Sequence, residues 1–327
     1  MRNILPFVCL LATASIAGNA QVMELPAVIK APIHINPAMT GLIPGDVRIV
    51  GNYYGHKDAE APRQWKSADL SADMRVLKKL LPKRDALGVG ITYQYGTDRN
   101  TFFDYTGTYN LAGLAVAYHK SLSKSGRHHL SVGLHLKSVT TEITQSPSSP
   151  EANIKPYRNY DIGAVYSGQV GKAVSLYGGY AITRFIKTDI LYVTQQQEYP
   201  MNITSGNSVF AGGSVIVGSA TSVHAHILVL NEHFRHDVQA SGYARFVLNK
   251  QKGDSKKPDF ALTGGTLLLY KNKVMPNVGV EWAGVRLGLA RGIKSENGSN
   301  RWLLSVAYTG DGKTKPEKGT WNCPAIF

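Results

Sequence analysis

Cysteine is scarce in this sequence, with two residues among 327. Cys9 lies in an N-terminal apolar run that we expect to be removed, so Cys323 would be the sole cysteine of the mature chain. One cysteine cannot form an intramolecular disulfide. The fold therefore has to be held by packing and hydrogen bonds alone.

Long apolar runs are also missing. After residue 20, no stretch approaches roughly 18 consecutive apolar residues, so the sequence predicts no transmembrane helix. A large exported protein with neither disulfides nor helical spans is either soluble or a β-barrel. Mean hydropathy is −0.15, which is too polar for a helical membrane protein but usual for a barrel with a polar lumen.

Enzyme motifs are absent as well. No G-x-S-x-G, H-E-x-x-H or Walker motif occurs. His224 and His226 share one face of an expected strand, but no set of Cys, Asp or Glu ligands accompanies them, so we interpret them as lumen or interface histidines. We expect no metal site, no cofactor and no enzymatic activity; a barrel hydrolase with a Ser/His pair on its strands is the open alternative.

Positive charge is abundant, with a formal net charge of +14. Much of it falls in expected turns, at Lys78, Lys79, Lys83 and Arg84, and again at Lys250, Lys252, Lys256 and Lys257. These cations do not interleave with aromatic residues on one face, so nucleic-acid binding is not supported. We interpret them as solvated turns, with a dedicated anion patch as the alternative.

The first 20 residues read as a secretory signal peptide. Arg2 supplies a short positive region, residues 4–17 are apolar, and Gly18-Asn19-Ala20 forms a small-residue cleavage site before Gln21. We therefore expect residues 1–20 to direct export.

Strict alternation of apolar and polar residues dominates the rest of the chain. In Leu87–Gly96, the residues Leu87, Val89, Ile91, Tyr93 and Tyr95 share one face, and small or polar residues share the other. A membrane barrel places the apolar face against lipid and the polar face toward the lumen. Glycines on that polar face would leave room for an arm or a loop inside.

Fourteen runs of this kind occur, and the first four are Val47–Gly55, Trp65–Arg75, Ala86–Gly96 and Thr106–Lys120. The others are His128–Thr144, Arg158–Gly168, Ala173–Arg184, Ser208–Gly218, Thr221–Asn231, His236–Asn249, Phe260–Tyr270, Pro276–Trp282, Val285–Ile293 and Arg301–Thr309. Most match the roughly 9–11 residues that span a bilayer as a strand, and exceed usual sandwich strands. We predict an all-β fold, a single-domain transmembrane antiparallel β-barrel of about 14 strands.

The domain organisation follows from these runs. Residues 21–46 hold four prolines and are expected to form a periplasmic or lumenal arm, residues 47–309 the barrel, and residues 310–327 a periplasmic tail. With an even number of strands, the first strand begins and the last strand ends on the same side of the membrane, which we expect to be the periplasm. Longer loops such as Phe185–Asn207 would then be extracellular, while the basic turns Val76–Asp85 and Lys250–Asp259 would be periplasmic.

The arm and the tail are the candidate functional segments. Asn36, Pro37 and Gly41 could simply form a turn into the first strand, or they could dock the arm in the lumen or against a periplasmic partner. In the tail, Pro324 argues against a sheet-interior strand and Cys323 is interpreted as a lone thiol.

Three stretches carry a family resemblance. His34–Gly41 (HINPAMTG) resembles the NPA-x-x-G arm of the PorP/SprF family of outer-membrane proteins. Leu114–Leu134 resembles that family's central strands, and the terminal WNCPAIF is similar to its Cys-Pro-x-Phe tail, with one extra residue here. Between Phe185 and Lys273, the resemblance rests mainly on the spacing of the expected strands.

This resemblance implies a barrel of the cell outer membrane that takes part in type IX protein secretion and gliding motility. Such a protein would help to export or anchor surface-protein clients, and would work with periplasmic ring or peptidoglycan-binding components. The candidate partner-binding residues are then Asn36, Pro37, Gly41, Trp321, Cys323 and Phe327. The alternatives are a general or anion-selective porin, which the charge would suit, and a soluble secreted β-protein.

Overall fold

The computed structural model describes most of the chain between residues 32 and 310. The described ranges are 32–43, 45–57, 63–77, 80–82, 84–100, 105–145, 152–171, 173–186, 190–194, 198–201, 205–232, 235–248, 260–269, 273–293 and 300–310. The expected signal peptide, and all of the expected tail beyond residue 310, lie outside these residues.

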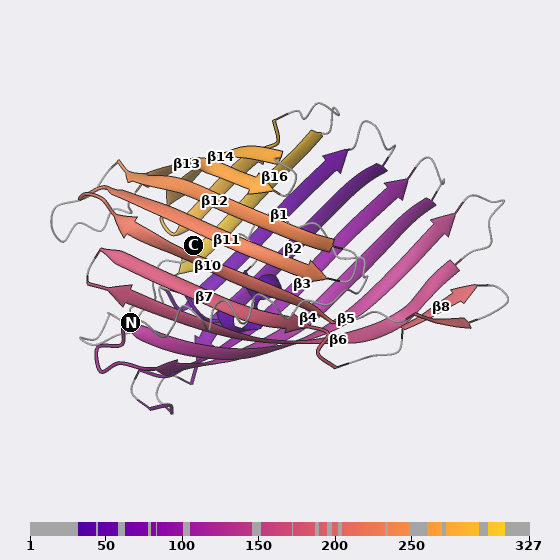
Figure 1. Ribbon diagram of the computed structural model, residues 1–327, viewed down its shortest axis with the longest axis horizontal. Coiled ribbons are helices and arrows are strands. Elements are labelled where there is room, and N and C mark those ends of the chain that lie inside the picture. The colour runs from indigo at the N-terminus through magenta and orange to yellow at the C-terminus, as the bar shows by residue number, and fades with distance from the viewer. Residues whose placement is uncertain are drawn as a thin grey trace.

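Antiparallel strands form a closed ring (Figure 1). The strands of its first half are β1 (Val47–Lys57), β2 (Arg63–Val76), β3 (Ala86–Asn100), β4 (Tyr105–Ser121), β5 (His128–Gln145), β6 (Ala152–Val170) and β7 (Val174–Thr183). Those of the second half are β10 (Gly206–Ile216), β11 (Thr221–Glu232), β12 (Arg235–Val247), β13 (Phe260–Leu269), β14 (Lys273–Trp282), β15 (Val285–Arg291) and β16 (Asn300–Gly310).

Each strand of the ring pairs with its neighbours along the chain, β10 pairs with β7, and β16 pairs with β1, so no edge of the sheet is left open. The prediction of a 14-stranded antiparallel barrel is therefore confirmed for the described residues. Val47 pairs with Gly310, so the barrel begins and ends on the same side, which we call the periplasmic side. No helix in the described ranges has the length and apolar character needed to cross a membrane.

The alternation seen in the sequence divides each strand between outside and inside. In β3, Ile91 points outward with 59% of its surface exposed, whereas the next residue, Thr92, is 4% exposed. Thr92 Oγ1 lies 2.9 Å from His135 Nε2 on the lumen side. The predicted assignment of the apolar face of Leu87–Gly96 to the outside is confirmed.

Aromatic side chains ring the periplasmic ends of the strands. Tyr118, Tyr166, Phe246, Trp282 and Tyr308 are all exposed and lie within the last few residues of β4, β6, β12, β14 and β16. Aromatic rings concentrate at the boundary between hydrocarbon and headgroups in membrane barrels. This girdle therefore marks the periplasmic edge of the apolar band.

Ile91→Arg is expected to block barrel assembly. An arginine near the middle of the lipid-facing band costs about 2–4 kcal/mol. The fraction of heat-modifiable, folded barrel on a gel should fall strongly. Thr97→Arg is the matched control, because Thr97 lies on the same outward face toward the end of β3, two residues before the exposed Arg99. Equal assembly of the two variants would contradict the outward assignment.

Two expectations at the extracellular side are wrong. Strand β6 begins at Ala152 rather than Arg158, because a register shift opposite Val139–Thr141 accommodates one extra residue near Pro156. Proline cannot donate to the ladder, but a bulge tolerates it. The expected loop Phe185–Asn207 contains the strands β8 (Ile190–Thr194) and β9 (Glu198–Met201), a hairpin that extends β6 beyond the ring.

Candidate functional site

The described part of the N-terminal arm lies inside the ring of strands (Figure 1). Its described part contains a short helix, α2 (Pro32–Ile35), and a 3-10 turn, η1 (Pro37–Met39), which packs against β4, β5 and β6. We call residues 32–43 the lumenal arm. Every residue from 36 to 43 is buried, so the arm is covered by the wall that surrounds it.

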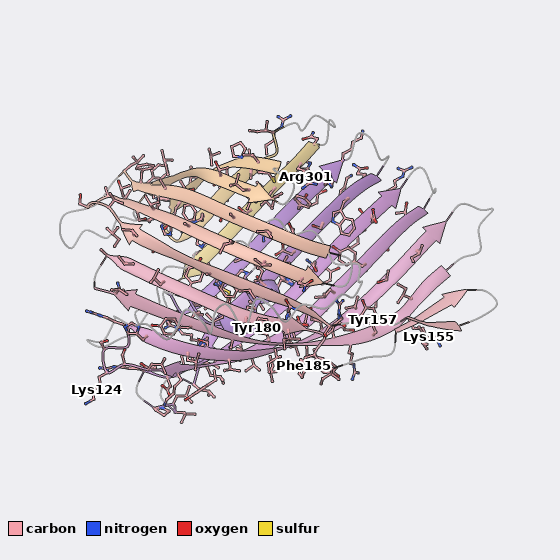
Figure 2. All side chains as sticks on the ribbon, viewed as in Figure 1. Lys124, Lys155, Tyr157, Tyr180, Phe185 and Arg301 are labelled. Atoms are coloured by element: carbon pink, nitrogen blue, oxygen red, sulfur yellow. The ribbon has the colours of Figure 1, made fainter. Side chains whose placement is uncertain are left out.

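Asn36 attaches the arm to the wall through its side-chain amide. Asn36 Oδ1 accepts a hydrogen bond of 2.9 Å from the backbone of Ala38 and so caps η1, whose first residue is Pro37. Asn36 Nδ2 donates to the backbone carbonyls of Ala164 on β6 and Tyr180 on β7, at 3.2 and 3.0 Å. Tyr180 is labelled in Figure 2. The Asn-Pro pair is thus both a turn and a wall contact.

Glycines on the lumen face make the space that the arm occupies. A Cβ would lie 2.0 Å from the Thr40 carbonyl oxygen at Gly88, 2.4 Å from the Pro37 carbonyl oxygen at Gly133, and 2.1 Å from Asn36 Oδ1 at Gly163. No real Cβ contact is this short, so a side chain at Gly88 or Gly133 would displace the backbone of the arm or the wall, and one at Gly163 would displace the Asn36 side chain. The expectation that lumen glycines leave room for the arm is confirmed.

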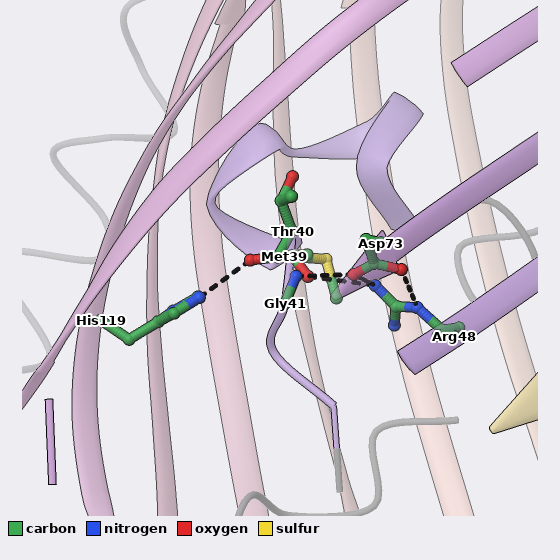
Figure 3. Close-up of polar contacts among 6 residues, drawn as sticks. All are labelled: Met39, Thr40, Gly41, Arg48, Asp73 and His119. Carbon is green, nitrogen blue, oxygen red and sulfur yellow. Dashed lines mark hydrogen bonds and ion pairs between the residues drawn. The ribbon is translucent and has the colours of Figure 1, made fainter. Parts of the chain in front are cut away.

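A buried ion pair fixes the turn at the end of the arm (Figure 3). Asp73 on β2 receives two hydrogen bonds from Arg48 on β1, at 2.9 and 2.8 Å, and both side chains are almost fully buried. Asp73 Oδ2 also accepts the Gly41 backbone N–H at 2.6 Å, and Arg48 donates to the Met39 carbonyl at 3.1 Å. One carboxylate therefore joins two wall strands to the arm.

Gly41 needs to be glycine for two reasons. Its φ of +74° lies in the left-handed region that other residues disfavour. A Cβ on it would also lie 2.6 Å from the Cα of Gly88 on the wall. The final residue of the NPA-x-x-G stretch thus allows the arm to turn toward β1 while lying directly against β3.

His119 holds the same turn from the other side (Figure 3). Its Nε2 lies 2.8 Å from the Thr40 carbonyl oxygen, and its Nδ1 lies 2.7 Å from Ser131 Oγ on β5. Because a carbonyl can only accept, Nε2 carries the proton that donates to Thr40. The arm is therefore bonded to β1, β2, β4, β6 and β7.

The arm also makes apolar contacts with the wall. Ala38, Met39 and Leu42 form a buried cluster with wall residues of β6, β7, β10 and β11, namely Val165, Tyr177, Phe210 and Leu228. Burial of this apolar surface supplies the non-directional part of the docking free energy. Polar anchors and apolar contact together specify one position for the arm.

The structure brings together three of the predicted site residues. Asn36, Pro37 and Gly41 all contact the barrel wall from inside. Trp321, Cys323 and Phe327 lie outside the described residues, so the roles predicted for them stay predictions. The two strand histidines are buried on the lumen side of β11, where both stack on Tyr243 and His226 also meets Tyr177 with the rings tilted by 37°. Within the described ranges, no group of three or more His, Cys, Asp or Glu side chains could hold a metal ion.

Sequence reasoning missed the anchors Arg48, Asp73 and His119. Alternation along Trp65–Arg75 puts Asp73 on the polar face of that strand, and this position is the available signal, since a carboxylate buried in a lumen needs a partner. The partner could not be identified, because Arg48 and Asp73 are paired by the β1–β2 register rather than by any local motif.

The barrel is similar to solved channels. The toluene transporter TbuX of Ralstonia pickettii matches with a TM-score of 0.57 and 9% identity, over 85% of this chain and 92% of that chain. The toluene transporter TodX of Pseudomonas putida matches with a TM-score of 0.52 and 11% identity, over 85% and 91%. The monoaromatic hydrocarbon channel CymD matches with a TM-score of 0.51 and 12% identity, over 87% and 94%.

Identities this low show a shared fold alone. The chain therefore has the fold of an outer-membrane β-barrel. No protein-family model matches the chain, and no curated protein matches it either.

Proposed function

We propose that this protein is a non-enzymatic outer-membrane barrel of the type IX secretion and gliding apparatus, which helps to export or anchor particular surface proteins. The observation that carries this proposal is the docked arm. Asn36, Pro37 and Gly41, which carry the resemblance to the PorP/SprF family, are among the residues by which the arm contacts the wall. The motif therefore serves to dock the arm in the barrel and is more than a local turn.

The docked arm suits a scaffold better than an open pore. It fills lumen space with buried side chains and is bonded to wall strands around much of the ring. A segment that is bonded to the wall at this many points keeps the barrel rigid and holds the two ends of the barrel in fixed positions. In this proposal, the loops, the arm and the tail then present binding surfaces to clients outside and to ring or peptidoglycan-binding components in the periplasm.

A deletion combined with a pulldown tests this proposal. Deleting the gene should remove one or a few surface proteins from the cell surface and impair gliding, and the full-length gene should restore both. A tagged full-length barrel should co-purify with periplasmic ring or peptidoglycan-binding proteins. An unchanged surface proteome together with normal gliding would overturn the proposal.

A porin is the second candidate, because the net charge of +14 would favour anions. Purified barrel in a planar bilayer distinguishes the two. The scaffold predicts little steady conductance while the lumenal arm is docked. Large, stable, anion-selective conductance in the wild-type protein would favour the porin instead.

A further inference from the structure

Two neighbouring periplasmic turns expose leucine side chains. Leu80, in the turn between β2 and β3, is 80% exposed, and Leu77 at the start of that turn is 49% exposed. Leu122, in the turn between β4 and β5, is 55% exposed. Single exposed apolar residues are ordinary, but several exposed leucines on adjacent turns favour a surface that another molecule covers.

The same two turns carry cations without carboxylate partners. Within the described residues, Arg84, Lys124 and Arg127 form no ion pair with an acid. The sequence adds Lys78, Lys79 and Lys83 to the first turn, and Asp85 is the only acid there. By sequence, the two turns together therefore combine exposed leucines with an excess of positive charge.

Asp85 does not neutralise these cations, because its carboxylate already accepts hydrogen bonds from residues at the end of β4. Its carboxylate accepts hydrogen bonds from the Tyr118 hydroxyl at 2.5 Å, from Lys120 Nζ at 2.9 Å and from the Ser121 backbone at 3.0 Å. Burial acts to raise the pKa of this carboxyl, but the hydrogen bonds from Lys120 and Tyr118 prevail and hold the pKa below its usual value. Asp85 is thus ionised at neutral pH, and among the described residues Lys120 is the cation that pairs with it.

The two turns also form one fixed surface. The bonds to Asp85 tie the first turn to the end of β4, and a Cβ at Gly126 would lie 3.4 Å from Arg84 Cδ, so Arg84 lies against the second turn. Leu77 and Arg84 have φ values of 56° and 78°, a left-handed conformation that is strained for residues other than glycine. Such strain concentrates at functional positions.

The order of residues along the chain separates this surface from the membrane. Tyr118 belongs to the aromatic girdle, and Lys120 and Asp85 mark the charged level beyond it. Leu122 directly follows the end of β4, and Leu80 lies in the middle of the turn between β2 and β3, so both leucines lie beyond the ends of the strands. Lipid tails do not reach that level, so the occupant that suits these leucines is a protein.

We propose that the leucine–cation face, formed by Leu80, Leu122, Arg84, Lys124 and Arg127, docks a periplasmic protein that presents an apolar patch bordered by carboxylates. Charge complementarity specifies the acidic border, and the exposed leucines specify the apolar centre. The periplasmic location of this partner rests on the proposed function.

Site-specific photocrosslinking in cells tests this docking surface. A photoreactive phenylalanine at position 80 of the full-length barrel should yield a protein adduct whose crosslinked peptide is acidic. Lys124→Glu combined with Arg127→Glu should reduce its yield at least about tenfold, the equivalent of about 1.4 kcal/mol. Val217 is the matched control position, because it is 68% exposed in the uncharged turn between β10 and β11 and should give no such adduct.

The contrary outcomes are distinct. Lipid adducts alone at position 80 would mean that the face meets the membrane, and a protein adduct insensitive to charge reversal would contradict charge-guided docking. Heat-modifiable mobility verifies that each variant has assembled. Loss of surface proteins on gene deletion without a charge-dependent adduct would overturn the docking surface alone, whereas such an adduct with normal secretion would overturn only the proposed function.

Discussion

Gly133→Ala is expected to push the lumenal arm away from its wall site. The new Cβ would lie 2.4 Å from the carbonyl carbon and oxygen of Pro37 and 2.5 Å from the Ala38 nitrogen. These are backbone atoms, so no side-chain rotation can relieve the clash. Strand β5 is hydrogen-bonded to neighbours on both sides, so the arm is the part that has to move.

Overpacking of this kind costs about 1–3 kcal/mol, which raises the undocked population roughly 5- to 150-fold. Proteinase K digestion of the folded barrel, followed by mass spectrometry, measures this population through cleavage within residues 32–43. Gly107→Ala is the matched control, since a Cβ at Gly107 would meet only one atom, at 3.9 Å. Equal protection of the arm in both variants would contradict the packing of η1 against β5.

Asp73→Ala is expected to destabilise both the arm and the periplasmic end of the barrel. The change leaves the Arg48 guanidinium, with 2% of its side chain exposed, without its carboxylate. It also removes the acceptor of the Gly41 N–H. Breaking a buried pair by removing one partner costs about 3–5 kcal/mol, because the remaining charge stays desolvated.

Two measurements report this loss. The temperature at which the barrel loses its folded gel mobility should fall, and hydrogen exchange at residues 38–42 should accelerate. The double variant Arg48→Met with Asp73→Leu is the control, since it leaves no unpaired charge and should lose less stability than the single change. A single variant as stable as the wild type would show that Asp73 does not anchor the arm.

Most of the barrel could be predicted from the sequence because the evidence for it is local. Side chains alternate with a period of two, so the outward face of Leu87–Gly96 follows from the residues themselves. The same alternation also predicts the two short strands β14 and β15 near the C-terminal end of the barrel. The bulge at Pro156 and the β8–β9 hairpin did not, because each depends on pairing with a distant part of β5 or β6.

The candidate site was predictable in part. Asn36, Pro37 and Gly41 were identified, and docking in the lumen was one of the readings left open. The choice between a simple turn and a docked arm depends on the wall residues that contact the arm. Two of these, Gly163 and His119, are 127 and 79 positions along the chain from the arm residues that they contact. The ring brings such residues together through strand register, and a slip of one residue would turn each of them outward.

A disulfide between the arm and the wall tests the central claim, that residues 32–43 are docked in the lumen. A Cβ at Gly163 would lie 2.8 Å from Asn36 Cγ, the position that Sγ takes in Asn36→Cys. In a disulfide, the Cβ of one cysteine lies about 3 Å from the Sγ of the other. Asn36→Cys with Gly163→Cys, in a Cys323→Ser background, should therefore form an intramolecular disulfide in the folded outer-membrane protein. Mass spectrometry should find that bond in the double variant, and two free thiols in an assembled barrel would contradict the docked arm.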